Sequence, residues 1–291
     1  MKIGFIGLGI MGSRMAANLQ KHEHLLAVHN RTKVKAESLI ANGALWLDTP
    51  AQAAEEVTLL FTMLSTPEAV RQVALGQDGF LNHLKPNSLW VDCSTVNPSF
   101  SRQMAAESLG RQVRFIDAPV VGSKDPAEKG QLLFLAGGDP VDVQACQPCW
   151  TAMGRQVIHL GGHGAGSAMK MLFAMLLGQS MLAFSEAMLL GESLGIPRET
   201  LFQVLFGAPV TAPFLAGKRT KIETGQYDAD FPLRWLHKDL QLASITGYEQ
   251  RTALPATNLA KEIYALAARA GLGDQDFSAI LQFLEQKGER T

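Results

Sequence analysis

The sequence predicts an α/β protein in which an N-terminal, doubly wound parallel sheet is followed by an all-helical part. From the start to about residue 160, short β-rich runs alternate with amphipathic segments, and after residue 163 the strands stop. The chain has 291 residues, roughly twice the usual size of a single-core domain. We therefore expect two domains, at 1–162 and 163–291.

The elements of the first half follow the order of a repeated strand–helix unit. The predicted strands lie at 3–6, 25–29, 57–63, 88–92, 115–118, 132–136 and 156–160. Helical spacing predicts intervening helices at 13–21, 67–75, 98–109 and 140–153, some with proline in the first turn. Strands separated by crossover helices predict a parallel sheet covered on both faces.

The second half is predicted to be helical, beginning with a long helix at 167–194. Its apolar residues occupy nearly every face, which is typical of a helix that is buried all round. At 1.5 Å per residue it is about 40 Å long, too long for half of one subunit to cover, so we expect a homodimer or homotetramer. Further helices are predicted at 198–206, 233–248, 255–270 and 277–286.

Composition excludes several classes of protein and partner. Lys and Arg number 26 against 27 Asp and Glu, so no net positive charge attracts nucleic acid or anionic lipid. The uncharged run between Lys170 and Glu186 has 15 residues, fewer than the roughly 20 that span a bilayer. We expect a small-molecule substrate, no membrane and a cytoplasmic location.

The cysteines predict neither disulfides nor a metal site. Cys93, Cys146 and Cys149 are too few and odd in number for a disulfide framework, which favours a reducing compartment. The C-x-x-C spacing of the last two has neither a second pair nor a nearby His to complete a zinc site. We expect packing residues and no metal.

A glycine motif after the first strand carries the strongest functional signal. It reads G-x-G-x-x-G and opens the first predicted helix, with the residues Gly7, Leu8, Gly9, Ile10, Met11 and Gly12. The first glycine permits a tight turn, the second lets the backbone approach a pyrophosphate, and the third allows close packing of helix on strand. The helix N-terminus favours phosphate, so the motif predicts a dinucleotide site; a glycine-rich turn is the alternative.

The end of the second strand predicts which dinucleotide binds. It reads Asn30, Arg31 and Thr32, where an NAD enzyme places a carboxylate for the ribose 2′-hydroxyl. Arg31 can pair with a 2′-phosphate, and Asn30 and Thr32 can donate hydrogen bonds to phosphate oxygens. This favours NADP(H) over NAD(H), the alternative being that Arg31 is a solvated loop residue.

The residues after the other strands complete the expected site, because ligands bind at the carboxyl ends of the strands in open α/β sheets. The segment of Met63, Leu64 and Ser65 is expected to contact the cofactor. Thr95 either meets the nicotinamide and substrate or caps the next helix, and the two roles are compatible. In the turn at Val121, Gly122 and Ser123, backbone N–H groups could hold a substrate carboxylate.

Lysines in the helical half are the candidate proton donors. Lys170 lies among apolar residues, where an unpaired ammonium is costly, and it could protonate a carbonyl oxygen during hydride transfer; otherwise it reaches solvent. Lys238 and Asp239 form a second candidate, for which a surface ion pair is the alternative.

Together the motifs resemble the β-hydroxyacid dehydrogenase family, which includes relatives of 3-hydroxyisobutyrate and 6-phosphogluconate dehydrogenases. The likeness covers essentially the whole chain, at the glycine motif, 92–95, 117–120, 164–170 and 238–240. It implies a Rossmann domain joined through a long helix to an all-helical domain, assembled as dimers or tetramers. It also implies that Lys170 is catalytic, that Thr95 contacts cofactor and substrate, and that Lys238 reaches the cofactor with support from Asp239.

Within that family, segment 123–132 and the end of the second strand look like the glyoxylate and succinic semialdehyde reductase branch, which favours NADPH. Two positions depart from the pattern. Val121 stands where the family has Ser, and Ala174 stands where an Asn lies one helical turn after the lysine. Both changes make the pocket less polar and bear on the substrate.

The expected function is therefore NADPH-dependent interconversion of a small hydroxy acid or alcohol and its aldehyde or keto form. Two alternatives remain open from the sequence. An imine reductase shares this architecture, although such enzymes usually carry Asp or Tyr in place of Lys170. A non-catalytic NADP-binding oligomerisation module is the other, since Val121 and Ala174 could redirect or abolish the family activity.

Overall fold

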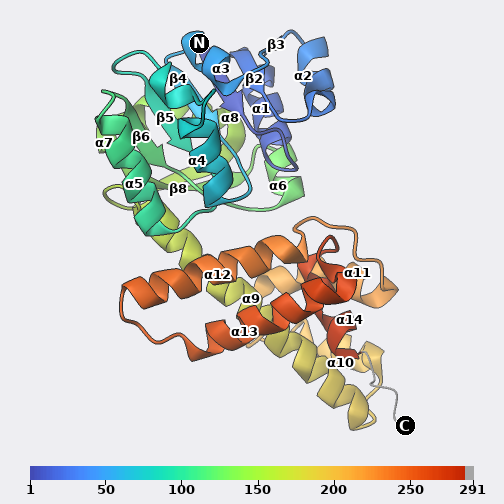
Figure 1. The fold of residues 1–291 in the computed structure, drawn as a ribbon. Coiled ribbons are helices and arrows are strands. Elements are labelled where there is room, and N and C mark those ends of the chain that lie inside the picture. The colour runs from blue at the N-terminus through green and yellow to red at the C-terminus, as the bar shows by residue number, and fades with distance from the viewer. Residues whose placement is uncertain (286–291) are drawn as a thin grey trace. The chain divides into compact units, whose positions relative to one another are not determined.

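The computed structural model describes residues 1–285 (Figure 1). The chain divides into two compact units, Met1–Lys170 and Met171–Thr291. Helix α9 (Ala165–Ser193) begins in the first unit and continues into the second. The functional boundary that we place between residues 162 and 163 stays a prediction.

The first unit is built on one sheet whose strands run in the order β3-β2-β1-β4-β5-β6-β8-β7, with β9 paired to β8. The strands are β1 (Lys2–Ile6), β2 (Leu25–His29), β3 (Leu45–Trp46), β4 (Leu59–Thr62), β5 (Leu89–Asp92), β6 (Arg114–Asp117), β7 (Val120–Val121), β8 (Leu132–Gly138) and β9 (Gly154–His159). The strand order reverses between β1 and β4. The sheet is therefore doubly wound, as predicted, and the switch point lies beside the glycine motif.

The expectation of a wholly parallel sheet is wrong at one edge. The six strands β3, β2, β1, β4, β5 and β6, in their order across the sheet, pair in parallel. Strand β8, however, runs antiparallel to both β6 and β7. A parallel return needs a crossover, usually a full helix, whereas the connection from β6 to β8 contains only β7 and the five-residue helix α6 (Lys124–Glu128). The short strands β3 and β7 were not predicted, because two residues are too few to show a period.

Helices cover both faces of the sheet, and the alternation of strand side chains explains why. Ile3 and Phe5 of β1 belong to one core cluster, whereas Ile6 belongs to another on the opposite face. The same alternation separates Val91 from Trp90 on β5. The remaining helices of this unit are α1 (Gly12–Lys21), α2 (Glu37–Ala41), α3 (Pro50–Glu55), α4 (Pro67–Leu75), α5 (Pro98–Leu109), α7 (Pro140–Ala145) and α8 (Gln147–Met153).

The single helix predicted at 140–153 is in fact two. Helices α7 and α8 meet at Cys146, the C-cap of one and the N-cap of the other. Pro148 follows two residues later, and proline can neither donate a backbone N–H nor fit inside a continuous helix.

All three cysteines are buried and free, as expected for packing residues. Burial raises the pKa of the Cys149 thiol to about 12, which leaves it unreactive.

The second unit is helical, as predicted. Besides α9 it contains α10 (Arg198–Leu205), α11 (Arg219–Thr224), α12 (Leu233–Glu249), α13 (Pro255–Ala267) and α14 (Ile280–Glu285). Its core includes Met181 and Met188 of α9 and Tyr264 of α13, all completely buried. Helix α13 ends before the predicted residue 270, and the turn that follows it holds Gly271 at φ +93°. The last residue of the predicted helix 277–286 lies outside the described residues.

Helix α9 is the one helix of residues 1–285 that is long and apolar enough to cross a membrane. Core helices of globular proteins pass the same test of length and composition. Met181 and Met188 lie in the core of the helical unit, which accounts for much of this apolar character.

Candidate cofactor and substrate site

The glycine loop between β1 and α1 has the geometry that its motif predicts. Gly7 has φ +97°, and its N–H donates to the carbonyl of His29 at 3.0 Å. A Cβ on Gly7 would lie 2.3 Å from the carbonyl oxygen of Met63, and one on Gly12 would lie 1.9 Å from that of Gly7. A Cβ on Gly9 would meet nothing within 4 Å. Gly7 and Gly12 are therefore required by the fold, whereas Gly9 faces open space.

The loop is tied to the end of β2 by Asn30. Its amide oxygen accepts from Leu8 N at 3.0 Å, and its amide nitrogen donates to the carbonyl of Thr32 at 2.9 Å. Arg31 and Thr32 are exposed immediately beside it. The amide of Asn30 thus shapes the loop, and Arg31 is left at the surface beside it.

Ile10 and Met11 complete the loop at the start of α1. Ile10 is exposed, and Met11 is half-buried against the sheet core. Ser13, the second residue of α1, donates its hydroxyl to the carbonyl of Gly9 at 2.9 Å. The first turn of α1 is therefore closed on the loop, so that the helix N-terminus lies beside Gly9, as phosphate binding requires.

A second group of predicted residues meets at the ends of β4 and β5. Leu64 N donates to the hydroxyl oxygen of Ser94 at 2.9 Å, and Ser94 N donates to Asp92 Oδ1 at 3.1 Å. The Thr62 hydroxyl also donates to Asp92 Oδ1, at 2.8 Å. These bonds join the segment of Met63, Leu64 and Ser65 to the loop that carries Thr95. The sequence predicts both segments, but not the carboxylate that joins them.

Two carboxylates at this edge of the sheet are buried. Asp92 ends β5 and Asp117 ends β6, and the two are register partners. Burial raises the pKa of each carboxyl to about 6, although hydrogen bonds from Ser94 and Thr62 to Asp92, and from Gly164 and Ser167 to Asp117, oppose the shift. The negative charge of Asp117 adds to the increase in the pKa of Asp92.

The candidate catalytic lysine, Lys170 of α9, is hydrogen-bonded to the segment that follows β6. Lys170 Nζ donates to the carbonyl oxygen of Val120 at 2.7 Å. Val121 pairs with Leu133 of β8 and is half-buried, and Gly122 follows at φ +127°. Ser123 is the N-cap residue of the short helix α6. The structure therefore brings Lys170 to the same turn as Val121, Gly122 and Ser123, from residues 50 positions apart in the chain.

Three predicted residues belong to the second unit and are described within it. Ala174 is buried, one helical turn after Lys170 along α9. On α12, the ammonium of Lys238 lies 2.9 Å from Asp239 Oδ1, and both side chains are largely shielded from solvent. This pair is therefore more enclosed than the surface ion pair weighed from the sequence.

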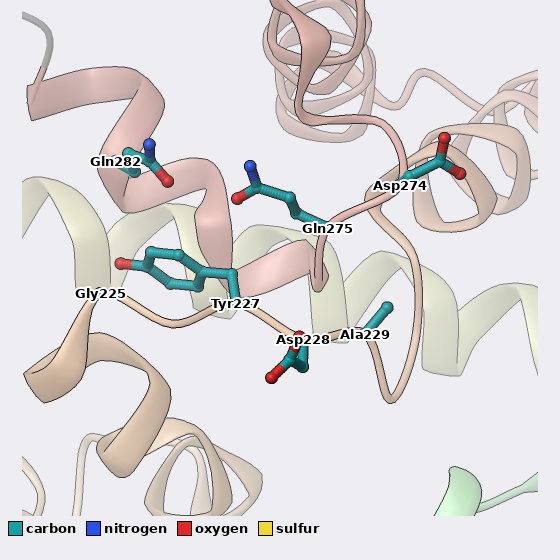
Figure 2. Close-up of a pocket in the computed structure, with 7 residues that line it drawn as sticks. All are labelled: Gly225, Tyr227, Asp228, Ala229, Asp274, Gln275 and Gln282. Carbon is teal, nitrogen blue, oxygen red and sulfur yellow. The ribbon is translucent and has the colours of Figure 1, made fainter.

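An open pocket of about 390 Å³ in the second unit lies among the segments that contain Gly225, Asp274 and Gln282 (Figure 2). Tyr227 lines it, and burial raises the pKa of this phenol to about 12. The pocket contains none of the predicted site residues. No group of three or more His, Cys, Asp or Glu side chains within residues 1–285 is arranged to hold a metal ion.

Ser94 and Asp117 lie in motifs that the sequence analysis names, but it assigned neither side chain a role. Ser94 links the loops after β4 and β5, and Asp117 binds the backbone at the start of α9. A signal existed for Asp117, since a carboxylate that ends a predicted buried strand needs polar partners. Its partners, nearly 50 residues away, were not predictable from local pattern.

Family models match both halves of the chain. Residues 2–161 match the NAD-binding domain of 6-phosphogluconate dehydrogenase. Residues 164–284 match the NAD-binding domain of NADP-dependent 3-hydroxyisobutyrate dehydrogenase. The glycine loop and Lys170 therefore each fall inside a matching segment.

Named relatives match over nearly the full length. Glyoxylate/succinic semialdehyde reductase 1 of Arabidopsis thaliana is 36% identical over 97% of this chain and 98% of its own. The chloroplastic reductase 2 of the same plant is 35% identical over 100% of this chain and 81% of its own. The structure of Mycobacterium tuberculosis 3-hydroxyisobutyrate dehydrogenase with L-serine is similar at a TM-score of 0.89 and 30% identity, covering 98% and 99% of the two chains.

These matches agree with the geometry of the doubly wound sheet, the glycine loop and the helical second unit. They show an oxidoreductase that binds a pyridine nucleotide and acts between CH–OH and C=O on a small molecule. The chain therefore belongs to the 3-hydroxyisobutyrate dehydrogenase-like family of NAD(P)-dependent hydroxyacid dehydrogenases, in the branch of the glyoxylate and succinic semialdehyde reductases.

Proposed function

We propose that this protein is an NADPH-dependent reductase of a small aldehyde or keto acid of the glyoxylate or succinic semialdehyde kind, with Lys170 as general acid and base. One observation carries the proposal: the Lys170 ammonium donates to the Val120 carbonyl at 2.7 Å, at the carboxyl edge of the sheet. Ligands bind at this edge in doubly wound folds. An ammonium in that place can deliver a proton to a reacting oxygen.

The glycine loop fits the pyrophosphate of the cofactor. The space in front of Gly9 leaves room for phosphate oxygens, and Gly7 and Gly12 hold the turn. We assign the pyrophosphate to Gly7, Leu8, Gly9, Ile10, Met11 and Gly12, and the nicotinamide side to Met63, Leu64, Ser65 and Thr95. In the helical unit we assign Lys238 to the cofactor, with Asp239 holding its ammonium.

The end of β2 favours the phosphorylated cofactor. Arg31 and Thr32 are exposed there, and Lys33 Nζ lies 5.4 Å from the centre of the Trp46 ring. No Asp or Glu occupies the segment 30–35 to receive a ribose 2′-hydroxyl. Arg31, with Thr32 and the backbone that Asn30 orders, would therefore bind the 2′-phosphate of NADPH.

The proton chemistry belongs to Lys170, and the bound nicotinamide supplies or accepts the hydride. In reduction the ammonium donates a proton to the carbonyl oxygen as negative charge develops there. In oxidation the neutral amine takes that proton back. The Val120 carbonyl fixes the amine, because its hydrogen bond restricts a side chain that would otherwise sample many rotamers.

The turn at Val121, Gly122 and Ser123 would hold the acid group of the substrate, with Thr95 beside it. Val121 and Ala174 supply no polar group, so the site recognises fewer polar atoms than the family pattern does. We therefore expect weaker selection for small acids and better acceptance of larger or less polar carbonyl compounds.

A spectrophotometric assay tests the function directly. Purified protein is mixed with NADPH, and absorbance is followed while glyoxylate, succinic semialdehyde, larger aldehydes, ketones and cyclic imines are added in turn. Lys170→Ala should retain NADPH binding and lose most of the turnover, and the exposed Lys129→Ala is the control.

Each outcome of this assay has a distinct meaning. Carbonyl-dependent oxidation of NADPH that requires Lys170 supports the proposal. Turnover of cyclic imines alone identifies an imine reductase. Tight NADPH binding without any turnover identifies a non-catalytic module, and near-normal rates in Lys170→Ala remove the assigned mechanism.

We further propose a homodimer or homotetramer in the cytoplasm. The long helix α9 exposes apolar side chains, notably Leu172, Leu176 and Leu190, at 52, 69 and 61% of their surface. Exposed apolar surface of this kind is typical of subunit interfaces. Light scattering coupled to gel filtration would give the subunit number, and a monomer at micromolar concentration would contradict the proposal.

A further inference from the structure

Asp117 holds the first turn of helix α9 with both of its carboxylate oxygens. Oδ1 accepts from Gly164 N at 2.7 Å, and Oδ2 accepts from Ser167 N at 2.8 Å. The side chain is almost completely buried. The first backbone N–H groups of a helix have no partner within the helix, so a carboxylate from a distant strand here replaces the usual cap.

The same strand segment binds the next turn of the helix through the candidate catalytic lysine. Val120 lies three residues after Asp117, and its carbonyl accepts from Lys170, which lies three residues after Ser167. Residues three apart share a face of a helix. The segment from Asp117 to Val120 therefore binds two successive turns of α9. It binds the backbone of the first turn and the ammonium of Lys170 in the next.

The packing around this contact leaves the helix little freedom to shift. A Cβ on Gly166 would lie 2.0 Å from the carbonyl oxygen of Leu135, and one on Gly137 would lie 2.7 Å from Asp117 Oδ1. Gly166 therefore packs against the backbone of Leu135, and Gly137 packs against both the Asp117 carboxylate and the backbone of Gly162. On the remaining side, the hydroxyl of Ser167 lies 2.7 Å from that of Ser101 on α5.

We propose that Asp117 is a positioning residue for Lys170, one that sets where the ammonium lies through its two bonds to the start of α9. The inference rests on the proposed role of Lys170. When both carboxylate oxygens accept hydrogen bonds, they fix the position of the helix along its axis and its rotation about that axis. A single hydrogen bond fixes only the position or only the rotation. Displacements of about 1 Å can cost about 100-fold in rate, so such a support acts on turnover more than on binding.

Protonation of Asp117 should loosen the support. The charged and titratable groups that face this region are Asp92 on β5, Arg102 of α5 beside Gly164, and His163 just before the helix, whose ring bonds the carbonyl of Phe115. Burial raises the pKa of Asp117 to about 6. A protonated carboxyl keeps one good acceptor oxygen, so one of its two backbone bonds weakens below that pH.

Hydrogen exchange tests the support in the unaltered protein, independently of activity. The opening that breaks these two bonds leaves the carboxyl buried, and because the bonds favour its ionised form, protonation favours the opening. The protection factors of the Gly164 and Ser167 amides should therefore fall about tenfold as the pH drops from 7 to 5, relative to core amides of β1. Protection that does not change with pH would overturn the two-bond support.

Variants then test the effect on Lys170. Asp117→Asn keeps the size but offers one acceptor, so kcat should fall about 10- to 100-fold, with the Kd for NADPH changed less than about twofold. The pH dependence of kcat near pH 6 should also weaken. Asp142→Asn is the matched control, since Asp142 of α7 is a buried carboxylate that pairs with Arg114 of β6.

The combined outcomes separate this inference from the proposed function. Faster exchange in Asp117→Asn together with unchanged kcat would reduce Asp117 to a structural cap and overturn the inference. If Lys170→Ala retains normal kcat, the proposed function fails, and the positioning role fails with it, even where exchange confirms the support. A Lys170-dependent kcat that also falls in Asp117→Asn, but not in Asp142→Asn, supports both.

Discussion

Asp92 and Asp117 lie opposite each other at the carboxyl ends of the neighbouring parallel strands β5 and β6, and both carboxyls are buried. Each binds a different part of the site. Asp92 accepts from Thr62 and Ser94, and Asp117 accepts from the start of α9. Two carboxylates thus organise the loops after β4 and β5 and the start of α9.

The first prediction concerns pH and stability. Burial raises the pKa of Asp92 from 3.8 to about 6, so between those values the folded state binds more protons than the unfolded chain. The contribution of Asp92 to the free energy of unfolding is therefore complete below pH about 4, and it is lost as the pH rises through about 6. Asp92→Asn should therefore gain stability relative to the wild type, by up to about 3 kcal/mol, as pH rises from 4 to 7.

Urea denaturation at four pH values between 4 and 7 measures this difference. The exposed Asp78→Asn is the control, for which the difference from wild type should stay nearly constant. A constant difference for Asp92→Asn as well would show that the ionisation of Asp92 is not coupled to folding.

The second prediction separates the roles of the glycines. Gly9→Ala should fold normally, because its new Cβ meets no atom, but it should bind NADPH about tenfold more weakly because the methyl group occupies the phosphate space. Gly12→Ala should lose about 1 to 3 kcal/mol of stability, because its Cβ would overlap the carbonyl of Gly7.

Thermal unfolding and fluorescence titration with NADPH check both variants. Gly217→Ala is the matched control, since a Cβ there also meets nothing within 4 Å. Unaltered NADPH affinity in Gly9→Ala would place the pyrophosphate elsewhere.

The third prediction concerns cofactor choice. Arg31→Asp should weaken NADPH binding about 10- to 100-fold, because a charge-assisted bond is lost and a like charge faces the phosphate. NADH binding should change little. Isothermal titration with both cofactors measures the ratio, and the exposed Arg155→Asp is the control for net charge. Equal losses for the two cofactors would remove the assignment of Arg31.

The fourth prediction concerns substrate polarity. Val121→Ser introduces a hydroxyl at the last residue of β7, and one added hydrogen bond of about 1 kcal/mol should raise kcat/KM for glyoxylate about fivefold. Steady-state rates with glyoxylate and with a larger uncharged aldehyde should diverge in Val121→Ser. Val210→Ser, at a highly exposed position, serves as control. Parallel changes on both substrates would place the acid group away from Val121.

The geometry of the glycine loop was largely predictable from local sequence. Gly7, Gly9 and Gly12 act through backbone angles and close contacts within a few residues, so their spacing alone specifies the loop. The exposed Arg31 lies two residues after the end of β2, and its position in the sequence therefore fixes its place at the sheet edge. Lys170 was singled out by its apolar neighbours in the sequence, and the family resemblance then implied its catalytic role.

The sequence by itself thus determined the doubly wound sheet, the long helix and the dinucleotide loop, because each follows from periodicity or from the steric demands of single residues. Only the tertiary structure decided that β8 runs antiparallel, that Asn30 holds Leu8, and that Asp117 binds the start of α9. The physical reason is that these bonds join groups from 20 to 50 residues apart, whose pairing is set by burial and hydrogen-bond satisfaction in the folded chain.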